Sequence, residues 1–178
     1  MKGEKLDTIK NLIRTIPDYP KKGIMFRDIT TLLADATGFK KTISGLCEPY
    51  VADTVDAVVA IEARGFILGG AVADRLGCSF IPLRKKGKLP YKTFKQEYVL
   101  EYNSDTIEIH ADAIKQDARI IIIDDLIATG GTAEAAVKLI KLIGGEIIGA
   151  AFVIDLAEMG GRQKLESIGV GCNVLVTY

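Results

Sequence analysis

One stretch of the chain, residues 120–132, places residue types in an order that suits phosphate binding. It runs from four isoleucines through a carboxylate pair into a glycine turn: Asp124, Asp125, and then Ala128, Thr129, Gly130, Gly131 and Thr132. Glycine lets the backbone approach a ligand closely and leaves its N–H groups pointing outward. A helix that begins after the turn adds partial positive charge, and the two threonines add hydroxyl donors. The turn therefore predicts a phosphate cradle, one that lacks the lysine of a Walker A loop.

The carboxylate pair indicates what accompanies that phosphate. Asp124 and Asp125 would repel a bare phosphate, but they accept hydrogen bonds from vicinal hydroxyl groups. A ligand with a phosphate at one end and a diol beside it is a ribose 5-phosphate. The alternative is an acidic strand end followed by an ordinary glycine turn. The complete order of strand, carboxylates, turn and helix favours the ribose-phosphate site.

Apolar segments supply the elements that position this stretch. Continuous apolar runs are typical of strands buried on both faces, and they predict strands at residues 57–61, 79–83, 120–123, 147–154 and 174–176. Apolar residues at helical spacing predict helices at residues 4–16, 38–50, 67–76 and 132–143. The alternation of strands and helices predicts an α/β fold around a parallel sheet.

Residues 84–96 differ from the rest of the chain because they are strongly basic. They carry Arg84 and five lysines before the first acid at Glu97. Such a segment is not suited to a core, so it predicts an exposed and mobile loop. After it, residues 98–102 and 106–110 predict the two arms of a hairpin.

Length and composition exclude several classes of protein. The 178 residues fit one domain, and 48% hydrophobic residues exclude a mainly disordered chain. Lys plus Arg equals Asp plus Glu at 23 each, which argues against a general nucleic-acid or membrane-surface binder. The N-terminus lacks the apolar stretch of a secretory signal, and no apolar run approaches the ~20 residues of a membrane span. These features predict a cytoplasmic protein.

Cysteine and histidine usage argues against disulfides and zinc. Cys47, Cys78 and Cys172 are scattered without CxxC spacing, which predicts reduced thiols. His110 is the only histidine, which argues against a zinc site. We expect all four residues to be structural.

The stretch from strand to helix resembles the 5-phosphoribosyl 1-pyrophosphate (PRPP) binding motif of the type I phosphoribosyltransferases. Three further segments resemble the members of that family that act on adenine. They are Phe26-Arg27-Asp28-Ile29-Thr30, Glu62-Ala63-Arg64-Gly65-Phe66, and Gly87-Lys88-Leu89-Pro90 with Tyr98-Val99-Leu100-Glu101-Tyr102. The segments follow the family's order and spacing, and the resemblance covers nearly the whole chain.

The resemblance implies a fold, a reaction and partners. The fold is a Rossmann-like parallel sheet flanked by helices, a single domain over residues 1–178, with a base-binding hood at about 1–35 and a mobile lid hairpin at about 84–105. The reaction transfers the 5-phosphoribosyl group from PRPP to adenine and gives AMP and pyrophosphate, a step of purine salvage. Mg²⁺ is expected to be held mainly by PRPP, pyrophosphate and water, without a direct protein ligand. The partners are these small molecules and a second copy in a homodimer, with no nucleic acid and no membrane.

Residue roles also follow from the resemblance. The 5-phosphate is assigned to Ala128, Thr129, Gly130, Gly131 and Thr132, and the ribose to Asp124 and Asp125. Pyrophosphate is assigned to Ala63, Arg64, Gly65, Arg84 and Lys88, and adenine to Met25, Phe26, Arg27 and Leu126. The catalytic set is Glu101, Arg64 and Lys88, in which Glu101 exchanges a proton with the purine N7 while Tyr102 gates the site.

Three details of the resemblance concern the loops around pyrophosphate. A cis peptide is expected at Glu62–Ala63, and Arg84 is expected to reach the neighbouring subunit's site. The other lysines of the basic segment are interpreted as a solvated face: Lys85, Lys86, Lys92 and Lys95. Simpler interpretations remain open for Arg64 as a surface arginine, Phe26 as a core aromatic and Glu101 as a charge at a strand end.

Other functions are weighed against this one. A related transferase could act on xanthine, hypoxanthine or orotate, but the segment at residues 26–30 and the acid at Glu101 argue against it. A PRPP-sensing regulator would need a nucleic-acid-binding domain or a basic face, which zero net charge and 178 residues do not provide. A nucleotide-binding module without chemistry would not need a separate pyrophosphate loop and lid.

Overall fold

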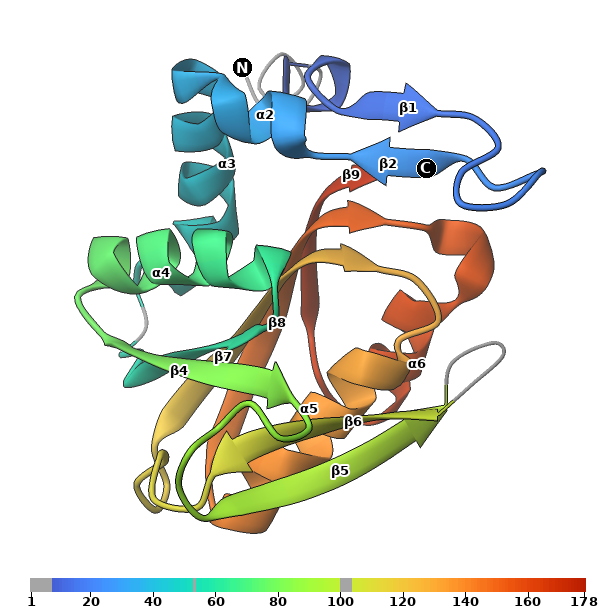
Figure 1. Cartoon of the computed structure of the whole chain (residues 1–178). Helices are drawn as coiled ribbons and strands as arrows, with labels where there is room; N and C mark the ends of the chain where they lie inside the picture. Colours follow the sequence, from blue (N-terminus) through green and yellow to red (C-terminus); the bar gives the residue numbers. More distant parts are fainter. Residues whose placement is uncertain (1–7, 53, 100–103) are drawn as a thin grey trace. The chain divides into compact units, whose positions relative to one another are not determined.

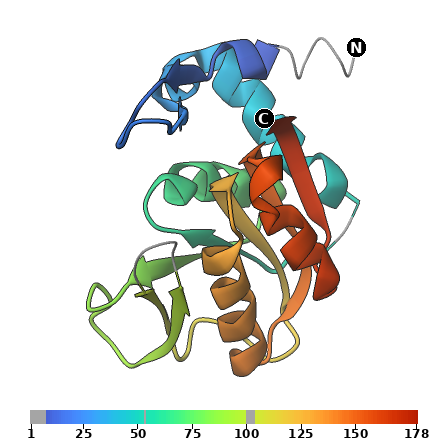
Figure 2. The same cartoon turned by 90° about the vertical axis from the view of Figure 1, so that its right-hand side faces the viewer.

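The computed structural model describes residues 8–52, 54–99 and 104–178. They fall into two compact units, divided between Gly45 and Leu46. The larger unit is a β-sheet with helices on both faces (Figures 1 and 2), which confirms the predicted α/β fold class.

The smaller unit contains a pair of antiparallel strands where the sequence predicts the end of a helix. Residues 8–11 are helical, but β1 (Arg14–Ile16) pairs with β2 (Phe26–Asp28). The helix predicted over residues 4–16 is therefore wrong at its C-terminal end. Apolar spacing does not reveal that a later strand takes up the backbone hydrogen bonds of these residues.

Two helices follow β2. α2 (Thr30–Ala34) begins beside Asp28, whose carboxylate accepts hydrogen bonds from the Thr30 backbone N–H at 2.9 Å and from its hydroxyl at 2.7 Å. α3 (Ala36–Cys47) is followed by a 3-10 turn, η1 (Glu48–Tyr50), so the helix predicted over residues 38–50 ends in a tighter turn.

A seven-stranded mixed sheet forms the larger unit, in the order β5-β6-β4-β3-β7-β8-β9 (Figure 1). The strands are β3 (Ala57–Ile61), β4 (Ser79–Lys85), β5 (Thr93–Val99), β6 (Ser104–His110), β7 (Arg119–Ile127), β8 (Glu146–Asp155) and β9 (Cys172–Thr177). The five strands β4, β3, β7, β8 and β9 are parallel, as predicted. The remaining two, β5 and β6, form an antiparallel hairpin on the edge beside β4.

The parallel strands are apolar because helices cover both faces of the sheet. On one face α4 (Arg64–Leu76) packs so closely that a Cβ on Gly69 would lie 2.5 Å from the Ala60 Cβ. On the other face α5 (Gly131–Ile143) and α6 (Gly161–Ser167) close the main core, which contains Ile122 and Phe152. All four isoleucines of residues 120–123 are fully buried. The continuous apolar runs that predict a parallel sheet therefore reflect burial of the strands on both faces of the sheet.

The basic segment is more ordered than the sequence predicts. Residues 84–85 belong to β4 and residues 93–96 to β5, so only the residues between these strands form a loop. The arm predicted at residues 106–110 is part of β6, whereas only residues 98–99 of the arm predicted at 98–102 belong to β5 and residues 100–102 lie outside the described residues; β5 and β6 pair from Thr93 with His110 to Val99 with Ser104. β5 is an edge strand, and lysines are common in edge strands. Its lysine-rich sequence therefore resembles the sequence of an exposed loop.

Strand β7 also extends further than predicted. The sequence predicts a strand over residues 120–123 and a loop from Asp124 to Gly131, whereas β7 continues to Ile127 through its pairing with β8. α5 follows at Gly131, and its predicted apolar stripe is buried at Ala136 and Ile140. α6 and the 3-10 turn η2 (Ala157–Met159) are not predicted from the sequence.

Two absences concern the part of the chain that the structure describes. None of its helices is long and apolar enough to cross a membrane. Cys47, Cys78 and Cys172 are all free thiols, as expected.

The central strand leads to a stability prediction. Ile122→Ala removes a fully buried side chain from the main core and should lower the free energy of unfolding by about 2–5 kcal/mol. Leu142→Ala, on the outer side of α5 where the leucine is 63% exposed, should change it by less than about 0.5 kcal/mol. Urea unfolding followed by circular dichroism measures both, and equal losses would contradict the assigned core.

Candidate active site

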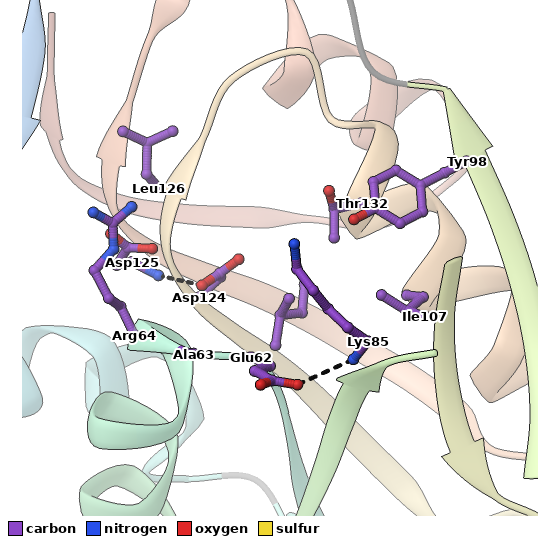
Figure 3. A pocket seen from close by; sticks show the side chains of 11 residues that line it. Glu62, Ala63, Arg64, Lys85, Tyr98, Ile107, Asp124, Asp125, Leu126 and Thr132 are labelled. Carbon is purple, nitrogen blue, oxygen red and sulfur yellow. Dashed lines mark hydrogen bonds and ion pairs between the residues drawn. The ribbon is translucent and has the colours of Figure 1, made fainter. Parts of the chain in front are cut away.

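Two cavities adjoin at the C-terminal ends of the parallel strands, within the larger unit. One, of about 310 Å³, is lined by Ile61, Glu62, Ala63, Arg64, Lys85, Tyr98, Ile107, Asp124, Asp125, Leu126 and Thr132 (Figure 3). The other, of about 160 Å³, is lined by Asp124, Leu126, Ile127, Ala128, Thr129, Gly130, Gly131, Thr132, Ala133 and Phe152. Asp124, Leu126 and Thr132 border both cavities. In open α/β sheets, ligands bind outside this end of the strands.

The smaller cavity is formed by the predicted phosphate cradle. All five residues from Ala128 to Thr132 line it, as the glycine turn predicts. Gly130 has φ +76°, a left-handed conformation that favours glycine, and α5 begins at the next residue. The N-terminus of α5 therefore borders the cavity, where it presents unpaired backbone N–H groups and partial positive charge.

Gly161 supports this loop, and the sequence analysis missed it. Its backbone N–H donates to the Ala128 carbonyl at 2.9 Å. A Cβ on Gly161 would lie 2.2 Å from that carbonyl oxygen and 2.6 Å from the Gly130 nitrogen. Lys164, in the same helix as Gly161, pairs with Glu134 of α5 at 2.6 Å. The adjacent glycines at residues 160–161 are the only sequence signal for this support, and they do not reveal what they approach.

The carboxylate pair lies between the two cavities. The Asp125 backbone N–H donates to Asp124 Oδ1 at 2.8 Å, and Asp125 Oδ2 lies 2.8 Å from Arg64 Nε. Burial raises the pKa of Asp124, and the charge of Asp125 raises it further. Burial also raises the pKa of Asp125, although Arg64 opposes the shift. Two crowded, buried carboxyl groups are well suited to bind hydroxyl donors, as predicted for a diol.

The segment after β3 lies against these carboxyl groups. The Glu62–Ala63 peptide is cis, as expected from the resemblance. Ala63 precedes the first turn of α4, and Arg64 reaches Asp125. A Cβ on Gly65 would lie 2.8 Å from Asp124 Oδ1, so only glycine allows this approach without a shift. Arg64 is therefore part of the site and not an isolated surface arginine.

Arg84 and Lys88 gather around Glu62, a residue to which the sequence analysis assigned no role of its own. Lys88 Nζ lies 2.5 Å and Arg84 Nε 3.4 Å from the Glu62 carboxylate, which also accepts the Lys85 backbone N–H at 3.1 Å. Burial alone would raise the pKa of Glu62, but the hydrogen bonds from Lys88, Lys85 and Arg84 outweigh it and lower the pKa to about 2. Glu62 lines the larger cavity, whereas Arg84 and Lys88 contact Glu62 but do not line the cavity themselves.

Two lysines of the basic segment are not merely solvated, contrary to the sequence interpretation. Lys85 lines the larger cavity and pairs with Asp105 at 3.1 Å. Lys95 pairs at 3.1 Å with Glu108, which is only 2% exposed. Both acids lie on β6, Glu108 directly opposite Lys95 and Asp105 two positions from the residue opposite Lys85. Sequence spacing does not reveal such a cross-strand partner.

Tyr98 is a further residue of the site that the sequence analysis did not assign. It extends from β5 into the larger cavity, with its hydroxyl directed toward Thr132 (Figure 3). The same hydroxyl lies 3.3 Å from Asp105 Oδ2. Burial raises the pKa of Tyr98, which keeps it protonated and able to donate a hydrogen bond. The hairpin thus forms one wall of the cavity next to the cradle.

The residues assigned to adenine lie in both units. Leu126 borders both cavities of the larger unit. Met25, Phe26 and Arg27 belong to the smaller unit, where Phe26 makes an edge-on ring contact with Tyr19 at 5.2 Å and Arg27 donates to the Thr15 hydroxyl.

The proposed acid and gate, Glu101 and Tyr102, lie outside the described residues. Within residues 8–52, 54–99 and 104–178, no three His, Cys, Asp or Glu side chains are grouped to hold a metal ion. The carboxylate oxygens of Asp124 and Asp125 are nevertheless hard donors of the kind that Mg²⁺ accepts directly or through water.

Comparison with known proteins agrees with this geometry. The family model for the phosphoribosyl transferase domain matches residues 30–169. The adenine phosphoribosyltransferase of Methylorubrum populi is 55% identical over 178 residues, which cover 100% of this chain and 98% of that protein. The crystal structure of adenine phosphoribosyltransferase from Rhodothermus marinus matches with a TM-score of 0.93 and 46% identity over 99% of each chain.

A third similar protein was solved with ligands. Adenine phosphoribosyltransferase from Saccharomyces cerevisiae, complexed with D-2,5-dideoxy-2,5-imino-altritol 1,6-bisphosphate and adenine, matches with a TM-score of 0.91 and 35% identity. The match covers 98% of this chain and 99% of that chain.

The support of the cradle leads to a prediction. Gly161→Ala places a methyl group against Ala128 and Gly130 and should weaken binding of ribose 5-phosphate at least about tenfold, because the loop must move. Gly171→Ala is the control, since a Cβ there meets nothing within 4 Å. Calorimetric titration of both variants measures the change, and unaltered binding by Gly161→Ala would show that the cradle tolerates displacement.

Proposed function

The chain belongs to the phosphoribosyl transferase family, and from this premise we propose how its two cavities bind and position the substrates. Its activity is that of an adenine phosphoribosyltransferase, which transfers the 5-phosphoribosyl group of PRPP to adenine and forms AMP and pyrophosphate in purine salvage. One observation carries the residue assignment: the joined cavities are lined by the phosphate cradle, then the carboxylate pair, and then the cations Arg64 and Lys85, with Arg84 and Lys88 behind Glu62. PRPP carries its phosphate, diol and pyrophosphate in the same order.

The cradle and the carboxylates hold the ribose 5-phosphate. Backbone N–H groups of Gly130 and Gly131 and the hydroxyls of Thr129 and Thr132 donate to the 5-phosphate, with Ala128 completing the loop. The carboxyl groups of residues 124–125 bind the ribose hydroxyls. As the glycosidic bond breaks, the ribose acquires positive charge, which these carboxylates stabilise where they face it.

The opposite end of the larger cavity receives pyrophosphate. Arg64, Arg84 and Lys88 supply positive charge, and the backbone N–H groups of Ala63 and Gly65 supply uncharged donors. Arginine suits this task because its planar donors match two phosphate oxygens at once. Arg64 and Lys88 stabilise the negative charge that develops on the leaving group, and this is their proposed catalytic role.

Magnesium fits this end of the site as an ion that arrives with its substrate. The hard donors are the carboxylate oxygens of Asp124 and Asp125, which would hold the ion through water beside the pyrophosphate oxygens. When bound, Mg²⁺ neutralises part of the leaving-group charge.

The resemblance assigns adenine to two apolar side chains, Leu126 of the larger unit and Phe26 of the smaller unit. Backbone groups of Met25 and Arg27 form hydrogen bonds with the edge of the adenine ring. Glu101 exchanges the proton at the purine N7, and Tyr102 gates the site. A lid that excludes water also protects PRPP from hydrolysis.

A homodimer in the cytoplasm completes the proposal. Two large apolar side chains are exposed on neighbouring elements of the larger unit: Ile67 on α4 is 50% exposed and Phe80 on β4 is 39% exposed. Such residues suit a subunit interface, and Arg84 is proposed to contribute to the site of the second copy. The free thiols suit a reducing compartment.

The direct test of this function is an assay of the purified protein with PRPP, Mg²⁺ and one base at a time. We expect AMP from adenine and no nucleotide from hypoxanthine, guanine, xanthine or orotate, measured by chromatography. A nucleotide from another base would overturn the assigned base pocket. PRPP binding without any product would favour a regulator instead.

Substitution of the proposed acid tests the mechanism. Glu101→Gln should lower kcat at least about tenfold while PRPP still binds, because the amide cannot exchange the proton at N7. Glu97→Gln, an exposed position on β5, is the matched control and should retain its activity. Steady-state kinetics and PRPP titration separate the two effects. Unchanged turnover in Glu101→Gln would remove this residue from the mechanism.

A further inference from the structure

We propose that Glu62 is a positioning residue for the reaction: its carboxylate holds Arg84 and Lys88 in the arrangement that receives pyrophosphate. The inference rests on the proposed function, in which Arg84 and Lys88 bind pyrophosphate, Arg84 in the site of the second copy. It assigns to Glu62 an effect on PRPP and pyrophosphate binding, exerted through these two cations and without contact between Glu62 and substrate.

The contacts of Glu62 with β4 and the turn after it carry the inference. Oε1 lies 2.5 Å from Lys88 Nζ and 3.4 Å from Arg84 Nη2, while Oε2 lies 3.4 Å from Arg84 Nε. Oε2 also accepts the Lys85 backbone N–H at 3.1 Å. One carboxylate therefore contacts two cationic side chains and the end of the strand that carries them.

Burial makes Glu62 the fixed partner in this cluster. Its side chain is 10% exposed, whereas Arg84 is 34% and Lys88 47% exposed. It also follows directly on β3, whose pairing with β4 continues through the Glu62 N–H to the Leu83 carbonyl at 3.0 Å. Glu62 therefore sets the positions of the two cationic side chains, because its carboxylate is anchored by the sheet whereas their charged groups extend toward solvent.

The turn is arranged around the same cluster. Arg84 Nη1 donates to the Lys88 carbonyl at 3.1 Å, and on the other side of the turn the Gly87 N–H donates to Glu108 at 3.1 Å. Glu62 is the acid of this pair that lines the larger cavity. The turn is thus held by two carboxylates, and only one of them faces the cavity.

Electrostatics explain why a binding site for an anion contains this carboxylate. Arg84, Lys85 and Lys88 are close in sequence and repel one another, so without a counter-charge their side chains would separate. Long cationic side chains lose rotamer freedom when they bind a ligand, and a group that is already ordered loses less. The contact of Glu62 with the Lys85 backbone N–H does not compete with substrate. It therefore persists when pyrophosphate binds the charged groups of Arg84 and Lys88.

The experiment compares Glu62→Gln, Lys88→Met and the double variant in the PRPP and adenine assay. Glutamine keeps the shape and the acceptor for Lys85 but loses the charge. We expect Glu62→Gln to raise the KM for PRPP about tenfold, with kcat and the KM for adenine changed less than about threefold. In the Lys88→Met background its effect on the KM for PRPP should shrink to less than about threefold, because one of the two positioned cations is gone.

Calorimetric titration with pyrophosphate and Mg²⁺ gives an independent reading, and the dissociation constant should rise by the same factor as the KM. A purely structural role would lower kcat and thermal stability, and its effect would be unchanged in the Lys88→Met background. If Glu62→Gln does not fold, Glu62→Asp keeps the charge but shortens its reach, and it should also raise the KM for PRPP.

The outcomes separate the inference from the function on which it rests. Unaltered or tighter PRPP binding by Glu62→Gln overturns the inference, and tighter binding would identify Glu62 as a competing anion. If Arg84→Met and Lys88→Met themselves leave the KM for PRPP unchanged, the assignment of these cations to pyrophosphate fails instead. An inactive wild-type chain would refute the proposed reaction.

Discussion

The parallel pairing of β3 with β7 is the constraint on which the site depends. With Ala60 opposite Ile123, β3 ends beside the middle of β7, and the segment at residues 62–65 meets the carboxylates at residues 124–125. The contact between Arg64 and Asp125 and the close approach of Gly65 to Asp124 both follow from that register. A shift of one residue would turn every side chain of β3 to the other face and separate the two loops.

Within this frame, the charges of the larger cavity are balanced before any substrate binds. Asp125 holds Arg64, Glu62 holds Arg84 and Lys88, and Asp105 holds Lys85. Each acid lies on a strand or strand end, and each cation lies on a neighbouring element. The acids of the chain therefore keep these cations ordered and close together.

Where prediction from the sequence differed from the structure, a partner distant in sequence was the cause. Residues 14–16 follow a helical pattern, but their backbone pairs with β2. The basic segment resembles a loop, but part of it forms an edge strand against β6. Lys85 and Lys95 resemble solvated lysines, but their acids lie on β6, the strand between β4 and β5. Local patterns contain no information about such partners, which become neighbours only when the chain folds.

The sequence by itself determined the α/β class, the buried strand at residues 120–123, and the glycine turn that lines a cavity together with the acids before it, because each depends on residues that are adjacent in the chain. Only the tertiary structure decided that Gly161 supports the cradle, that Tyr98 forms a wall of the cavity and that Glu62 gathers the cations of the β4 turn. These three residues act through contacts between separate elements. Sheet register and helix packing set such contacts, and the spacing of residues along the chain does not specify them.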